Sequence, residues 1–171
     1  MGEITDLFKQ ISLERDICKT QGYFYELAAI DGCDMSMFSD RYLRSRFCLR
    51  QMETRYSPYQ REDARTCLEF IYPEIGGPES MPFMGKNEHI FNPDVAYWAG
   101  YTYYQLYCET GVHGKDLVSQ VPFNSLIQNY KAHHTLDEIY STDILCAYYR
   151  LEKDDAHRRY EELLEKIAEE V

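Results

Sequence analysis

The chain has 171 residues, enough for one domain with a sizeable core or for two small helical units that share one. Its net charge of −11 repels nucleic-acid phosphates, so a nucleic-acid site would need a locally basic surface. No basic and apolar leader opens the chain, and no apolar run approaches the roughly 18 residues of a membrane span. We therefore expect a cytoplasmic protein that does not contact a membrane.

Six cysteines lie at wide, irregular intervals, without the close pairs that disulfide scaffolds and zinc sites use. We expect free, buried thiols, no metal and no cofactor. The 16 tyrosines are unusual, because tyrosine combines a large apolar body with a polar tip. Such residues occupy half-buried positions at the rim of a core or protein interfaces.

The first third of the chain predicts three helices. Residues 3–20 repeat apolar side chains at helical spacing, and Gln21-Gly22 is expected to close that helix. Residues 23–30 predict a second short helix that ends at Gly32. A capping signal begins at Asp34 and predicts a third helix whose inner face is Phe38, Tyr42, Leu43 and Phe47.

Positive charge is concentrated in residues 41–65, which contain seven arginines and only three acidic residues. The candidate basic patch consists of Arg41, Arg44, Arg46, Arg50 and Arg55. Tyrosines are interleaved with it, as in nucleic-acid interfaces, but an ordinary solvated helix face has the same composition. Both readings stay open at this point.

Ser57-Pro58 predicts the start of a fourth helix, with Ala64, Cys67, Leu68 and Ile71 facing inward and Pro73 at its end. Residues 73–91 are rich in proline and glycine and predict a connection without regular structure. We expect an N-terminal helical unit at 1–72 and a C-terminal unit at 92–171, with the possibility of one shared core.

The centre of the fold is predicted at residues 92–111, a helix that is apolar or aromatic around most of its circumference. Asn92 can cap its start, Pro93 suits the first helical position, and Gly111 can end it. A helix of this kind is surrounded by others, so we predict an all-α, multi-helix bundle around a central aromatic-rich helix.

Four further helices follow, at residues 115–120, from Val121-Pro122-Phe123 onward, after a capping box at Thr135 with the apolar run Ile139, Tyr140, Ile144 and Leu145, and at 154–171. At the start of the third of these, His134, Thr135 and Glu138 fit a capping box with a hydrophobic staple, so we assign them a capping role. The turn at residues 110–117 is compatible with a helix-turn-helix, but the surrounding charge is acidic and favours a tight corner between packed helices.

Asp94, Thr102, Gln105 and Glu109 form one narrow polar arc on the central helix. The candidate partner-binding residues on this helix are Trp98, Tyr101, Tyr104, Gln105 and Glu109. Trp98 lies in the middle of this arc, where a solvated residue is expected. Either the N-terminal unit covers the indole, or the indole anchors another protein, a role in which tryptophan is enriched.

A resemblance is carried by residues 95–147. The residues concerned are Gly100 to Tyr107, Thr110-Gly111, Val121 to Phe123, Tyr130, His133 to Thr135 and Asp143 to Leu145. This region resembles a family of short bacterial helical proteins that are encoded beside toxins of ADP-ribosyltransferase fold and are regarded as their antitoxins. The resemblance implies a helical protein that binds a toxin.

The sequence contains no nucleophile elbow, phosphate-binding glycine loop, dinucleotide fingerprint or zinc-protease motif. We therefore expect a protein without catalytic activity that binds another protein with a basic surface, as an antitoxin or an inhibitor of a bacterial toxin enzyme. Two alternatives remain. One is a phage or mobile-element inhibitor of a nucleic-acid enzyme that acts as an acidic mimic, and the other is a small-molecule enzyme that uses buried Cys or His.

Overall fold

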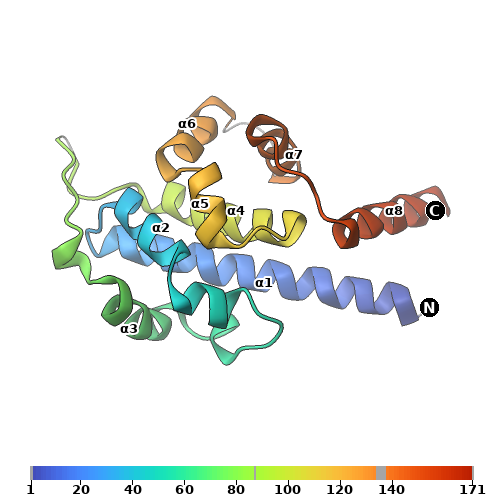
Figure 1. Cartoon of the computed structure of the whole chain (residues 1–171), viewed down its shortest axis with the longest axis horizontal. Coiled ribbons are helices and arrows are strands. Elements are labelled where there is room, and N and C mark those ends of the chain that lie inside the picture. The colour runs from blue at the N-terminus through green and yellow to red at the C-terminus, as the bar shows by residue number, and fades with distance from the viewer. Residues whose placement is uncertain (1, 87, 134–137, 171) are drawn as a thin grey trace.

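A computed structural model describes residues 2–86, 88–133 and 138–170 and confirms the all-α prediction (Figure 1). Its helices are α1 (Gly2–Ile30), α2 (Met35–Leu43), α3 (Ala64–Ile75), α4 (Pro93–Thr110), α5 (Gly114–Gln120), α6 (Phe123–His133), α7 (Glu138–Tyr149) and α8 (Asp155–Glu170). Three short turns complete them: the π-helical η1 (Cys48–Met52), and the 3-10 turns η2 (Pro58–Gln60) and η3 (Pro78–Ser80). Over the described residues no strand forms, and one isolated bridge joins Cys33 to Pro82.

Helix α4 has the predicted ends and the predicted central place. The Asn92 side chain accepts hydrogen bonds from the backbone N–H groups of Asp94 and Val95, and Gly111 adopts the left-handed conformation at φ 73°. Helix α1 runs along α4 and makes with it the most extensive helix pair of the molecule. Figure 1 shows α5, α6 and α7 on the other side of α4. The central helix is thus covered from two sides.

The predicted break at Gln21-Gly22 is wrong, because α1 continues through it to Ile30. A Cβ on Gly22 would lie 2.7 Å from the Tyr97 ring, and one on Gly100 would lie 2.7 Å from the backbone oxygen of Gln21. The Gln21 side chain also donates a hydrogen bond to the Gly100 oxygen, at 2.8 Å. The two glycines therefore allow a close approach of α1 and α4, and Gly22 does not end the helix.

The fourth helix differs from its prediction at both ends. Ser57 and Gln60 form a capping box in the short turn η2. Helix α3 starts only at Ala64, where the Asp63 side chain caps it by accepting a hydrogen bond from the Thr66 N–H. Pro73 lies inside α3, which ends at Gly76 with φ 98°. A proline one turn before a helix end removes a single backbone hydrogen bond, so the helix tolerates it there. The inner residues Ala64, Cys67, Leu68 and Ile71 are buried as predicted.

The predicted irregular connection at 73–91 is partly ordered. It contains the turn η3, and backbone hydrogen bonds join Asp34 to Met81 and Phe83 to Gly32. Met81 is fully buried. Buried residues before and after this connection belong to one continuous hydrophobic cluster.

The C-terminal part brings the two ends of the chain together. Figure 1 shows α8 beside the N-terminal half of α1, beyond the end of α4. The apolar side of α8 is only partly covered, with Leu163 and Ile167 half-buried and Leu164 exposed. The predicted capping residues His134 and Thr135 lie outside the described residues, and so does the Glu138 side chain. Among the described helices, none combines the length and apolarity that crossing a bilayer requires.

Candidate functional site

A cleft of about 330 Å³ lies between α1, α4, α7 and α8, and we call it the Glu109 cleft. Its polar lining side chains are Glu14, Arg15, Gln105, Glu109, Thr142, Asp143, Lys153, His157 and Glu161. Its less polar lining consists of Ile11, Cys18, Tyr101, Cys108 and Leu164. Four helices and the short α7–α8 link therefore contribute to one concave surface.

Glu109 forms the floor of this cleft, close to the C-terminus of α4. The residue is 8% exposed, and its side chain is hydrogen-bonded by Thr142 of α7. Its backbone oxygen accepts a hydrogen bond of 2.9 Å from the N–H of Asp154, whose side chain caps α8 at His157. The end of α4 thus fixes the start of α8 over the carboxylate.

The second carboxylate oxygen of Glu109, Oε2, is buried without a hydrogen-bond partner, and it is the only such side-chain atom found within the described residues. A buried acceptor in this state costs about 1–3 kcal/mol. Burial raises the pKa of Glu109 to about 7; Lys153 opposes this shift, whereas Asp143 and Glu161 add to it. A strongly shifted group in a cleft is a candidate functional residue.

Charged side chains from α7, α8 and their link converge on Glu109. His157 Nε2 lies 3.8 Å from Glu109 Oε1 and 3.4 Å from Glu161 Oε1. Lys153 Nζ lies 2.6 Å from Asp143 Oδ1 and 2.5 Å from Glu161 Oε1. Within the part of the chain that the structure describes, no set of His, Cys, Asp and Glu residues is arranged to hold a metal ion.

The cysteines at this cleft are thiols and not thiolates. All six cysteines are free, and burial raises the pKa of Cys18 and of Cys108 well above its ordinary value. The thiolate is the nucleophile in cysteine chemistry, so thiols with such high pKa values react slowly at neutral pH. A ligand in this cleft would therefore interact with its charged side chains and would not react with its cysteine sulfur atoms.

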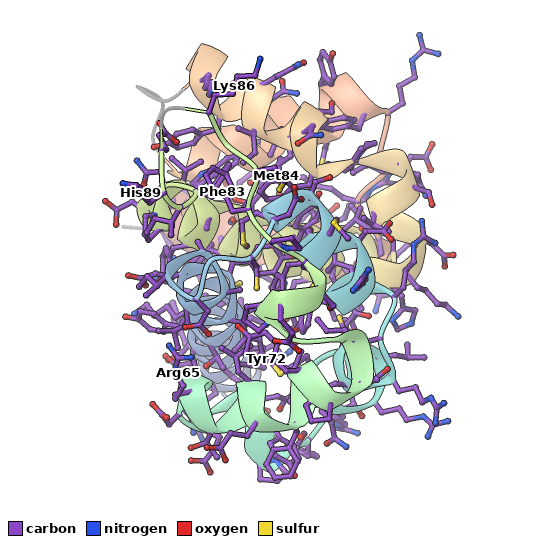
Figure 2. The ribbon with its side chains drawn as sticks, turned by 90° about the vertical axis from the view of Figure 1, so that its left-hand side faces the viewer. Arg65, Tyr72, Phe83, Met84, Lys86 and His89 are labelled. Atoms are coloured by element: carbon purple, nitrogen blue, oxygen red, sulfur yellow. The ribbon has the colours of Figure 1, made fainter. Side chains whose placement is uncertain are left out.

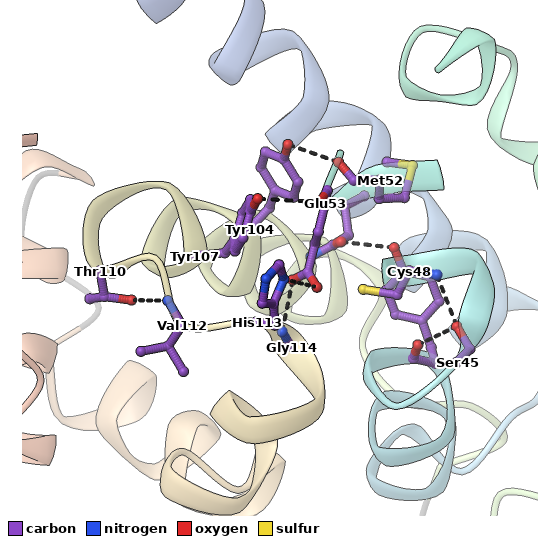
Figure 3. A network of polar contacts seen from close by, with 12 residues as sticks. Ser45, Cys48, Met52, Glu53, Tyr104, Tyr107, Thr110, Val112, His113 and Gly114 are labelled. Atoms are coloured by element: carbon purple, nitrogen blue, oxygen red, sulfur yellow. Dashed lines mark hydrogen bonds and ion pairs between the residues drawn. The ribbon is translucent and has the colours of Figure 1, made fainter. Parts of the chain in front are cut away.

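A second buried carboxylate, Glu53, belongs to a network of a different kind (Figure 3). Its Oε2 accepts a hydrogen bond of 2.8 Å from the Gly114 N–H, and its Oε1 lies 3.3 Å from His113 Nδ1. Tyr107 donates to the backbone oxygen of Glu53, and burial is the main cause that raises the pKa of the Glu53 carboxyl. These contacts tie η1 to α4 and to the start of α5. The Glu53 contacts to His113 and Gly114 hold the turn at residues 110–117, which the sequence predicts as a tight corner between packed helices.

The predicted partner-binding residues divide between the core and the surface. Tyr101, Gln105 and Glu109 line the Glu109 cleft together. Tyr104 is buried instead, and its hydroxyl donates to the Met52 backbone oxygen at 3.0 Å. Trp98 is half-buried, and its ring lies 4.8 Å from that of Tyr130 on α6. The indole is therefore flanked by α6 and retains an exposed part.

What we call the aromatic face consists of two groups of rings that share helix α4: Tyr23, Tyr97 and Tyr101 form one, and Trp98 and Tyr130 form the other. The ring centroids of Tyr23 and Tyr97 are 5.1 Å apart, and those of Tyr97 and Tyr101 are 6.1 Å apart. Tyr23 is 49% exposed, and the other four are half-buried. Tyr101 belongs to both the aromatic face and the Glu109 cleft, so the two surfaces are continuous.

The arginines of the candidate basic patch divide between internal contacts and the exposed surface. Arg41 donates to the Ile75 backbone oxygen at the end of α3, and Arg44 contacts Asp40 and Ser119. Arg46, Arg50 and Arg55 are exposed.

Farther along the chain, Arg61 pairs with Asp16 and Arg65 with Asp31. The Asp31 carboxylate also accepts a hydrogen bond from Tyr72, which Figure 2 shows near Arg65 on α3. The contacts of Arg41, Arg61 and Arg65 join separate elements of the fold, which favours the structural reading for these three residues.

Sequence reasoning missed the groups that approach Glu109 from the C-terminal part. These groups are far from Glu109 along the chain: Asp143, Lys153, His157 and Glu161. Only His157 and Glu161, which are four residues apart on one helix face, give a signal in the local sequence.

Comparisons with models of protein families, with curated proteins and with solved structures found no match to this chain.

Proposed function

We propose that this chain is a non-catalytic protein-binding protein, an antitoxin-like inhibitor of a bacterial toxin enzyme that acts in the cytoplasm. The observation that supports the proposal best is the aromatic face. Half-exposed tyrosine and tryptophan side chains are enriched in the centres of protein interfaces, where they supply much of the binding energy. The face combines Tyr23, Tyr97, Trp98, Tyr101 and Tyr130 on three packed helices.

The rings of this face are held in place before a partner arrives. Trp98 rests against Tyr130, and Tyr23 rests against Tyr97. Side chains that are already ordered lose little conformational entropy on binding, which favours affinity. All five residues lie on helices, so the backbone beneath the surface is regular as well.

Charge supports a basic partner. The chain carries a net charge of −11, and the Glu109 cleft next to the aromatic face contains four carboxylates. An acidic surface attracts a basic one over long distances and accelerates the encounter. The clefts of enzymes that act on nucleotides or nucleic acids are commonly basic, so such an enzyme is a suitable target.

The test is a comparison of tagged variants purified from the cell that encodes the chain. We expect the unmodified protein to retain one partner in stoichiometric amount. Trp98→Ala should weaken this complex by about 30-fold or more, the effect of losing an aromatic anchor of about 2 kcal/mol. Tyr56→Ala is the matched control, because Tyr56 is 78% exposed and is not one of the five residues of the aromatic face.

A purified partner then allows the inhibition itself to be measured. Addition of the chain should abolish the enzymatic activity of a toxin partner, and Trp98→Ala should shift the inhibition curve to higher concentration. Equal retention of the partner by Trp98→Ala and by the unmodified protein would contradict the proposal. A partner that is a nucleic-acid enzyme of a phage host would favour the acidic-mimic alternative instead.

A further inference from the structure

We propose that the Glu109 cleft is a binding site for a small aliphatic ammonium ion, with Glu109 as the group that receives its charge. The inference does not depend on the proposed function. It rests on the unpartnered buried oxygen of Glu109, on the charge of the cleft, and on the shape and chemistry of its walls.

The unpartnered oxygen Oε2 of Glu109 indicates that the site lacks a hydrogen-bond donor. Glu109 Oε2 is buried and is an acceptor, while the other oxygen of the same carboxylate faces His157 and the side chain is held by Thr142. A ligand that donates an N–H group to Oε2 would remove the cost of this buried acceptor. A cationic donor is favoured over a neutral one, because hydrogen bonds between ionised groups are about twice as strong.

The charge balance of the cleft also favours a cation. Glu14, Glu109, Asp143 and Glu161 contribute four carboxylates, against which Arg15 and Lys153 supply two permanent positive charges. His157 carries a positive charge only when protonated. An anionic ligand would meet an excess of negative charge, whereas an ammonium ion would reduce it.

Lys153 shows that an alkylammonium group fits this environment. Its Nζ lies in the cleft between Asp143 and Glu161, with 2.6 Å to the first carboxylate and 2.5 Å to the second. The same contact argues against a metal ion, because the oxygen of Glu161 that faces His157 is already bound to an ammonium group. Of the four carboxylates of the cleft, Lys153 contacts those of Asp143 and Glu161 directly, and those of Glu109 and Glu14 lie outside these two contacts.

The walls and the size of the cleft suit an aliphatic chain behind the ammonium group. Ile11 of α1 and Leu164 of α8 offer methyl groups, and the Tyr101 ring can interact with a cation through its face. A volume of about 330 Å³ lies at the lower end of the range of small-molecule pockets, about 300–1,000 Å³. The expected ligand class is therefore a short primary amine or diamine.

Calorimetric titration of the full chain with 1-aminobutane and 1,4-diaminobutane, at pH 8 in phosphate buffer, tests the proposal. We expect saturable binding of one amine per chain and no binding of 1-butanol, which lacks the charge. Glu109→Gln should weaken amine binding at least tenfold. Glu162→Gln is the matched control, because Glu162 is an exposed glutamate of α8 that does not line the cleft.

A pH series gives a second readout. An ammonium ion binds the ionised form of Glu109, whose pKa burial raises to about 7, with Asp143 and Glu161 adding to the shift and Lys153 opposing it. His157 and Glu14 also line the cleft. Affinity should therefore fall about tenfold from pH 8 to pH 6, with release of a proton on binding. The tenfold loss should disappear in Glu109→Gln.

Lys153→Met keeps the test decisive if Glu109→Gln does not fold. Removing the internal ammonium group takes from Asp143 and Glu161 their contact with Lys153, so amine binding should tighten at least threefold.

Nα-acetyl-lysine amide distinguishes the source of the ammonium group. Tighter binding of this compound than of 1-aminobutane would assign the site to a lysine side chain of a partner, and the reverse would assign it to a free amine. Lack of saturable binding by all three amines, or unchanged binding in Glu109→Gln, would overturn the proposal.

Discussion

Glu53 and Glu109 are both buried glutamates in an acidic protein, and their partners give them different roles. The carboxylate of Glu53 accepts a hydrogen bond from the Gly114 N–H and contacts a ring nitrogen of His113, and the Glu53 backbone oxygen accepts from Tyr107, so the residue joins η1, α4 and α5. The carboxylate of Glu109 has one oxygen without a donor and faces a cleft. A fully satisfied buried carboxylate stabilises a fold, whereas an unsatisfied one indicates a place for a ligand.

The raised pKa of Glu109 makes the stability of the protein depend on pH. In the unfolded chain this carboxyl has its ordinary pKa of 4.5, and burial raises the value to about 7 in the folded state. Between these two values the folded state holds a proton that the unfolded state has released. The contribution of Glu109 to the free energy of unfolding therefore falls as the pH rises through this window, by about 3 kcal/mol.

Glu109→Gln should remove this dependence. The variant should unfold at nearly the same urea concentration as the unmodified protein near pH 4.5 and should be more stable by about 3 kcal/mol above pH 8. The measurement is urea denaturation across pH 4.5–8.5 in buffers without amines, because an amine could occupy the cleft. Glu162→Gln should run parallel to the unmodified protein, and a parallel curve for Glu109→Gln would contradict the assigned pKa.

At the level of helices, the sequence predicted most clearly the elements whose ends are set by local signals. The predicted ends Asn92 and Gly111 of the central helix flank the observed α4. The cap at Asp34 is also confirmed, since its side chain accepts from the Met37 N–H. Capping requires only residues that are neighbours in the chain, so a single sequence contains the necessary information.

The predictions that failed involve residues whose role depends on distant contacts. Gly22 was interpreted as a helix end, but it lies under the Tyr97 ring of α4. The convergence of Lys153 and His157 on Glu109 likewise depends on how α8 returns to the end of α4, which no local pattern specifies. One sequence therefore predicted Glu109 as a polar position on a central helix but not the charged groups around it.

Gly100→Ala tests the close packing of the two longest helices. The added methyl group would lie 2.6 Å from the Tyr25 ring and 2.7 Å from the backbone oxygen of Gln21, so α1 would have to move. We expect a loss of about 2 kcal/mol in the free energy of unfolding, measured with urea, although alanine favours helix formation. Gly2→Ala, which meets no atom within 4 Å, should change stability by less than about 0.5 kcal/mol. Equal stability of the two variants would exclude this packing of α1 on α4.

At the scale of the whole molecule, the different lengths of α1 and α4 create the place for the cleft. Helix α1 has 29 residues and α4 has 18, so α1 is longer than α4 by about 16 Å at 1.5 Å per residue, and its N-terminal part extends beyond the end of α4 in Figure 1. Helix α8 lies beside this extension in Figure 1. The Glu109 cleft forms where α4 ends between the two helices, and its floor and walls therefore come from both ends of the chain.

The shared core predicts that the two halves of the chain depend on each other for folding. The apolar side of α1 is covered by α4, and buried residues on both sides of the 73–91 connection form one cluster. Separate fragments 1–76 and 92–171 should each retain some helical circular dichroism but bind a hydrophobic dye and show no cooperative urea transition. Mixing them should restore a one-to-one complex with a sharp transition.

A protease site inserted at Met84 provides the control for this experiment, because Met84 is 79% exposed and lies in the connection seen in Figure 2. Cleavage there after folding should leave the two parts associated and the urea transition cooperative, since the α1–α4 contact does not need the covalent link. Cooperative unfolding of either fragment alone would instead indicate two independent units, and the cleft between α1, α4, α7 and α8 would then depend on how those units associate.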